Sequence, residues 1–83
     1  NRFPVGRFLA LRAEVRKCEA RVEKLNEMSE KLAKKLADPE LYEEERLDEM
    51  AVWQKKYSEV MDAMDRAEEL WLKAQEKLEK AGR

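Results

Sequence analysis

The chain has 83 residues, of which 45% are charged and 43% hydrophobic, and its formal net charge is −1. A chain this short buries too little surface for a thick globular core, and its apolar content is too high for disorder, so long paired helices are expected. Histidine is absent, Cys18 is the single cysteine and no long uncharged stretch occurs, which excludes an internal disulfide, histidine chemistry and a membrane span. We therefore expect a cytoplasmic location, and the start at Asn1 suggests a fragment of a longer protein.

Residues 8–37 carry apolar side chains at alternating steps of three and four. The seam positions are Phe8, Leu11, Val15, Cys18, Val22, Leu25, Ser29, Leu32 and Leu36, and eight of these nine are apolar. Spacing that averages 3.5 residues is typical of a coiled-coil helix. It predicts a first helix at about residues 8–37, preceded by a linker at residues 1–7.

A corner is expected at residues 38–46. Asp38 can cap a new helical turn, and Pro39 suits the first position of that turn because its missing N–H would have been unpaired there. The 3.5-residue seam resumes at Met50, Trp53, Tyr57, Val60, Met64, Ala67, Trp71, Ala74, Leu78 and Ala81. A second helix is therefore predicted at about residues 47–81, and the short connection makes the helices antiparallel. The fold class is all-α, a two-helix antiparallel coiled-coil hairpin forming one domain at residues 8–81.

Matching of side-chain volumes suggests a register for the two helices. The predicted facing layers are Leu11 with Trp71, Val15 with Ala67, Leu25 with Tyr57, and Ser29 with Trp53. Small residues opposite large ones fill space without voids or overpacking. A register shifted by one heptad would use the same seam residues of both helices, and this alternative stays open.

Charges on the flanks of the seam separate by sign. With Phe8 and Met50 at heptad position a, the flank at positions g and c is rich in Lys and Arg on both helices, whereas the flank at e and b is mostly acidic. Antiparallel pairing sets g beside g, so the basic flanks should form one face that can follow phosphates. The candidate nucleic-acid contacts are Arg7, Lys17, Arg21, Lys24, Lys31, Lys35, Lys73, Lys77 and Lys80. The alternative is that these charges only support the helices through pairs four residues apart, such as Glu69 with Lys73.

Catalytic patterns are lacking in the sequence. Gly6 and Gly82 stand alone, so no glycine-rich loop for a nucleotide is present, and a two-helix rod offers no cleft for paired carboxylates. We therefore expect no enzyme activity, no metal site and no cofactor in this chain. The aromatic residues Trp53, Tyr57 and Trp71 occupy the seam, where packing is favoured over base stacking, and Cys18 is expected to be inert packing. Exposed apolar side chains remain at Met61, Leu70 and Leu72 and could seat a partner helix or a second copy.

A family resemblance begins at the corner. The sequence there reads Leu36-Ala37-Asp38-Pro39-Glu40-Leu41-Tyr42, and Glu68-Glu69-Leu70-Trp71 occurs late in the second helix. Over about residues 8–80 the chain resembles the C-terminal domain of ABC-F ATPases of the Uup type, although residues 1–7 depart from the family's opening segment. The resemblance implies a soluble cytoplasmic parent with two upstream ATP-binding cassettes that use ATP and Mg²⁺. It also implies that this domain binds DNA or contributes to contact with the ribosome and its RNA.

Two other functions stay open at the level of sequence. One is a protein-interaction or spacer arm that regulates the upstream cassettes through direct contact. The other is a tRNA-contacting arm of the kind that some aminoacyl-tRNA synthetases carry, since those arms share the hairpin shape. The expected partner is nucleic acid, DNA or ribosomal RNA, with no membrane partner, and a homodimer is compatible with the exposed apolar residues.

Overall fold

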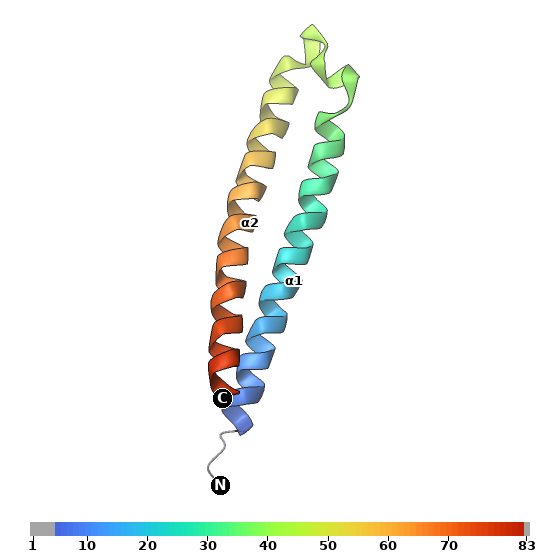
Figure 1. The fold of residues 1–83 in the computed structure, drawn as a ribbon. Helices are drawn as coiled ribbons and strands as arrows, with labels where there is room; N and C mark the ends of the chain where they lie inside the picture. The colour runs from blue at the N-terminus through green and yellow to red at the C-terminus, as the bar shows by residue number, and fades with distance from the viewer. Residues whose placement is uncertain (1–4, 83) are drawn as a thin grey trace.

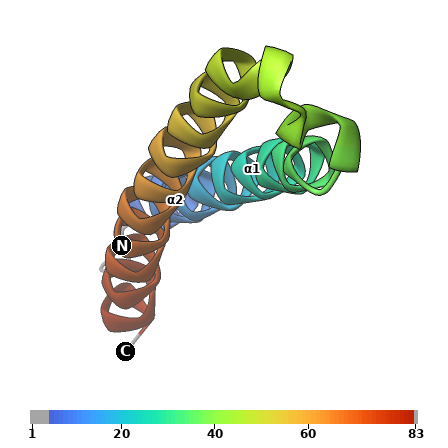
Figure 2. The ribbon, with the colours of Figure 1, turned by 90° about the horizontal axis from the view of Figure 1, so that it is seen from above.

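The computed structural model describes residues 5–82, which form a narrow helical hairpin (Figure 1). Helix α1 (Val5–Leu36) and helix α2 (Leu47–Ala81) run antiparallel and are joined by two short 3₁₀ turns, η1 (Pro39–Tyr42) and η2 (Glu44–Arg46). The rod measures 68 × 14 × 14 Å. Seen from the end that carries the turns, the two helices lie at an angle to one another and the turns bridge their ends (Figure 2). The predicted all-α hairpin is confirmed.

The predicted seam is the core of the rod. Each seam residue on either helix is buried or half-buried, whereas most flanking positions are exposed. At the centre, Leu25 of α1 packs with Val60, Met64 and Ala67 of α2. The rod has the width of two helices, so this single stripe supplies most of the apolar burial between them.

The predicted register is wrong by about one heptad. Ser29 was expected opposite Trp53, but Trp53 lies beside Lys35, six residues further along α1, where the Lys35 ammonium is 5.4 Å from the indole centroid. Leu25 likewise packs with Met64 rather than Tyr57. Volume matching failed because the Ser29 hydroxyl donates a hydrogen bond of 2.8 Å to the Asn26 carbonyl within its own helix. A satisfied hydroxyl can be buried against aliphatic groups and does not need a large aromatic partner.

Helix α1 starts earlier than expected. Val5 to Arg7 were assigned to a linker at residues 1–7, but they form the first turn of α1; the rest of that linker lies outside the described residues. The helix ends at Leu36, one residue before the predicted limit of 37, and α2 occupies the predicted residues 47–81. Met61 was expected to be exposed but is half-buried, whereas Leu70 and Leu72 are 55% and 54% exposed.

The corner is built from local hydrogen bonds around one buried leucine. The Asp38 Oδ1 atom accepts a hydrogen bond of 3.0 Å from the Glu40 N–H, and Pro39 follows as the first residue of η1. The Tyr42 hydroxyl donates to the Leu36 carbonyl at the end of α1. Leu41 is 0% exposed and fills the space between these groups and the helices. The predicted cap at Asp38-Pro39 is thus confirmed, and it fixes where the chain reverses.

Candidate nucleic-acid interface

The g and c flanks of the two helices meet along one side of the rod. Near the tip, residues from these flanks and from the seam line a shared groove of about 440 Å³: Met28, Lys31 and Leu32 of α1, and Trp53, Lys56, Glu59 and Val60 of α2. We call this the tip groove. Lys31 and Lys56, one from each helix, both border it. The expectation that the basic flanks lie side by side therefore holds at the tip.

The same side of the rod is basic at the open end, where the termini of the two helices meet. Arg7 of α1 and Lys77, Lys80 and Ala81 of α2 line a second groove there. Arg7 reaches this position because α1 begins at Val5, which places the arginine on the first helical turn. Cations from both helices thus converge at the open end as well as at the tip.

Lys17, Arg21 and Lys24 extend the basic side from the tip groove along α1 toward the open end. They line a hollow with Ala20, Leu25 and Met28, and all three cationic side chains are exposed. Steps of three and four residues in a helix separate such side chains by about 5 Å along the axis. The positive side of the rod is therefore a stripe rather than an isolated patch; we call it the basic stripe and define it by the nine predicted contact residues.

Three members of the basic stripe are ion-paired, which the sequence analysis did not anticipate for two of them. Lys35 lies 3.9 Å from Glu49 and Lys77 lies 3.6 Å from Glu14, both across the helices. Lys73 lies 3.4 Å from Glu69, the pair that the spacing of four residues predicted. All six side chains are at least a third exposed. Such surface pairs contribute only about 0–1 kcal/mol, so a phosphate can compete for these lysines.

Part of the other side of the rod is acidic, although Arg12 and Arg16 lie on the same flank nearer the open end. Glu19, Glu23 and Glu68 line a groove there, next to Val22, Asn26 and Trp71. The Trp71 indole nitrogen is buried without a hydrogen-bond partner in the part of the chain that the structure describes. The acidic side chains at this groove repel a phosphate backbone, so a polyanion is disfavoured at this part of the rod.

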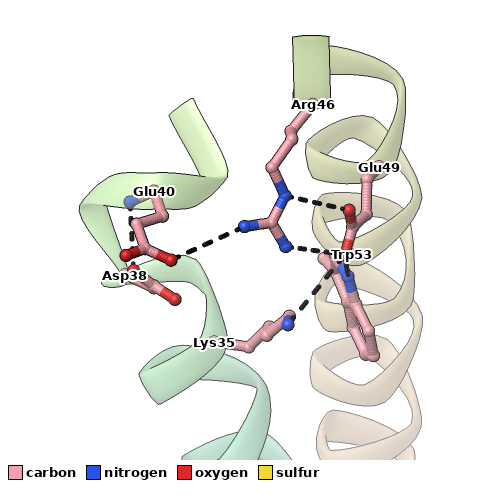
Figure 3. Close-up of polar contacts among 6 residues, drawn as sticks. All are labelled: Lys35, Asp38, Glu40, Arg46, Glu49 and Trp53. Carbon is pink, nitrogen blue, oxygen red and sulfur yellow. Dashed lines mark hydrogen bonds and ion pairs between the residues drawn. The ribbon is translucent and has the colours of Figure 1, made fainter. Parts of the chain in front are cut away.

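A polar cluster closes the tip beside the basic stripe (Figure 3). The Arg46 guanidinium donates two hydrogen bonds of 3.1 Å to the Glu49 carboxylate and lies 4.0 Å from Glu40. Glu49 also accepts a hydrogen bond of 3.4 Å from the Trp53 indole N–H. The hydrogen bonds from Arg46 and Trp53, helped by the charges of Arg46 and Lys35, lower the pKa of Glu49. The same bond to Glu49 raises the pKa of Arg46.

Sequence reasoning placed Trp53 in the seam but missed the charges around it. The Trp53 ring lies under two ammonium groups, with Lys35 at 5.4 Å and Lys56 at 5.0 Å from its centroid. The local part of this arrangement could have been found, because Glu49 precedes Trp53 by four residues and Lys56 follows it by three, spacings that share a helix face. Lys35 comes from the other helix and could not be placed without the register.

Within residues 5–82, neither helix contains a stretch apolar enough to cross a bilayer. The same residues contain no cluster of three or more histidine, cysteine or acidic side chains arranged around a potential metal position. Comparisons with protein families, with curated proteins and with solved structures find no match for this chain.

Proposed function

We propose that this chain is a non-catalytic, sequence-tolerant nucleic-acid-binding hairpin. The observation that supports this proposal is the shared border of the basic flanks. Lys31 and Lys56 border one groove from opposite helices, and Arg7 and Lys77 border another. Charges that served only to support each helix would be mixed in sign on both sides of the rod. Instead, six of the nine g and c positions from Arg7 to Lys35 are basic, whereas three glutamates line a groove on the opposite side: Glu19, Glu23 and Glu68.

Binding proceeds by charge neutralisation along the rod. Lys17, Arg21 and Lys24 of α1 lie about 5 Å apart along the helix axis, so these side chains can contact successive phosphates of one strand. Each phosphate neutralised releases condensed counterions, and the affinity falls with salt by a log–log slope of about −0.9 per phosphate for duplex DNA and about −0.7 for single strands. Six members of the stripe have no ion pair within residues 5–82, so a slope of about −4 for single strands and about −5 for duplex DNA is expected if each contacts one phosphate.

The parent protein proposed here is an ABC-F type ATP-binding protein of the cytoplasm. The corner sequence from Leu36 to Tyr42 supports this assignment, because the Asp38 cap and the buried Leu41 give that motif a structural role in reversing the chain. In such a parent the hairpin lies after two ATP-binding cassettes, which would use ATP and Mg²⁺. The hairpin then supplies contact with DNA or ribosomal RNA.

The exposed leucines give less support to a protein-interaction arm. Leu70 and Leu72 are both more than half exposed, but residues two apart on a helix point about 200° apart. They therefore lie on different sides of α2 and do not form one apolar patch for a partner helix. The basic stripe, in contrast, brings cations from both helices to one groove at the tip and to another at the open end.

Charge reversal on the stripe tests the proposal. Fluorescence anisotropy at about 50 mM salt would measure binding of a labelled 20-base-pair duplex and of a hairpin RNA. A variant with Lys17→Glu, Arg21→Glu and Lys24→Glu should bind at least about 30-fold more weakly, because three phosphate contacts become repulsive.

A matched control changes the net charge by the same amount away from the stripe. Arg12→Glu, Arg16→Glu and Lys55→Glu alter exposed side chains at heptad positions e, b and f. This control should retain affinity within about threefold, since charges that make no phosphate contact are screened over about 14 Å at this salt. Equal losses in the two variants, or no binding by the original chain, would contradict the proposal.

A further inference from the structure

The tip groove differs from the rest of the basic stripe because its floor is apolar and aromatic. Met28 and Leu32 of α1 and Val60 of α2 form this floor, and the Trp53 indole forms part of the wall. The other two grooves on the stripe have apolar residues in their lining but no aromatic ring. Only phosphate is needed to explain those positions, whereas the tip groove offers a surface that phosphate cannot use.

Trp53 is held in a fixed orientation within this groove. Its indole N–H donates to Glu49 at 3.4 Å, and Glu49 is itself fixed by two hydrogen bonds from Arg46 (Figure 3). The ring is half-buried, so it cannot swing freely between rotamers. A preoriented aromatic ring beside an apolar floor presents a flat surface at little entropic cost on binding.

We propose that the tip groove binds one unpaired base of a single-stranded nucleic acid, with the phosphates on either side of that base held by Lys31 and Lys56. This inference rests on the proposed function and adds a preference for unpaired over paired strands. The base would lie against Trp53, Met28 and Leu32. The volume of about 440 Å³ is within the range of pockets that hold small planar ligands.

The charges around the groove favour an anionic aromatic ligand over an apolar peptide. The Lys56 ammonium lies 5.0 Å from the Trp53 centroid and Lys31 borders the same groove, so two ammonium groups face an occupant against the single carboxylate of Glu59. A nucleotide supplies the ring and the charge together. Glu59 also lines the groove, and its carboxylate can accept a hydrogen bond from the exocyclic amino group of adenine or cytosine.

Binding requires Lys56 to leave the indole face. A cation over an exposed ring is held weakly, and a stacked base gains more from the same surface. The displaced ammonium then lies within reach of the adjacent phosphate, so its charge stays compensated. A base in a duplex must first be unpaired and unstacked to enter the groove, whereas a base in a single strand enters without that cost.

Oligonucleotides with and without bases separate this inference from the proposed function. The ligands are oligodeoxyadenylate of ten nucleotides and an abasic strand of the same length, which carries the same phosphates. The protein carries Trp71→Phe, which leaves Trp53 as its only tryptophan. We expect the strand with bases to bind at least about fivefold more tightly than the abasic strand and to quench Trp53 emission.

Two variants sharpen the result without disturbing the core. Met28→Gln removes part of the apolar lining of the groove at an exposed position. It should bring the ratio of the affinities for the strand with bases and for the abasic strand close to one, while the affinity for the abasic strand is kept. Leu70→Gln makes the same kind of change at the same heptad position outside the groove and should leave the ratio unchanged. Equal affinity for both strands with no change in Trp53 emission would overturn the base site and leave phosphate binding intact. Failure of both strands to bind would overturn the proposed function as well.

Discussion

The two ends of the rod are closed in different ways. At the tip, a capped turn, a fully buried Leu41 and the hydrogen-bonded pair of Arg46 and Glu49 tie the helices together. At the open end, where no turn joins the helices, the seam and the exposed ion pair between Glu14 and Lys77 hold the helix termini. We therefore expect the helices to be held together more firmly at the tip than at the open end, although the same 3.5-residue seam runs through both. The comparison teaches that the seam specifies pairing, whereas local polar contacts decide where pairing is strongest.

The largest difference between the ends should come from leucine truncation. Leu41→Ala removes a side chain that is 0% exposed and should lower the free energy of unfolding by about 3 kcal/mol, within the range for buried leucines. Leu11→Ala at the open end, where the side chain is half-buried, should cost about 1–2 kcal/mol. Urea unfolding followed by circular dichroism measures both. Equal losses at the two positions would show that the tip is not the firmer end.

The cap at the corner should have the next largest effect. Asp38→Ala removes the acceptor for the Glu40 N–H and should destabilise the hairpin by about 1 kcal/mol. Asp62→Ala is the control, because Asp62 is an exposed mid-helix residue and should change stability by less than about 0.5 kcal/mol. Thermal unfolding of both variants checks the difference. Equal melting temperatures for Asp38→Ala and Asp62→Ala would contradict the role of Asp38 in closing the tip.

The pair of Arg46 and Glu49 makes a pH-dependent contribution at the tip. Since the hydrogen bond from Arg46 lowers the pKa of Glu49 in the folded state, the stabilisation is fully present above the usual glutamate pKa, about 4.3. It is lost as the pH falls through the lowered pKa of the folded state. Arg46→Gln should therefore narrow the difference in melting temperature between pH 7 and pH 3. An unchanged difference would show that the pair does not stabilise the tip.

Much of the fold could be predicted from the sequence because the determinants are local. The steps from Phe8 to Leu36 identify the seam of α1, and Asp38-Pro39 marks the corner through backbone chemistry that needs no partner. Register is different, because every one-heptad shift of the helices pairs apolar residues with apolar residues. The hydrogen bond of Ser29 to its own helix removed the clue on which volume matching depended.

The candidate site also has one part that the sequence predicts and another that depends on the register of the two helices. The sidedness of the basic stripe follows from heptad position alone, and so the flanks of Lys31 and Lys56 could be assigned to one face before the structure was known. Contacts across the helices depend on register, so the pairing of Lys35 with Glu49 and the position of Lys35 over Trp53 were missed. The tip groove is lined by residues of both helices, so its composition depends on register and could not have been predicted from the sequence.

The smallest expected effect is at the ion pair of the open end. Lys77→Gln removes the partner of Glu14 but should change the free energy of unfolding by no more than about 0.5 kcal/mol, because both side chains are mostly solvated. A double-mutant cycle with Glu14→Gln isolates the pair from other effects. A coupling above about 1 kcal/mol would mean that the open end is tied as firmly as the tip. A negligible coupling would mean that Lys77 loses little interaction free energy when it releases Glu14 to contact a phosphate.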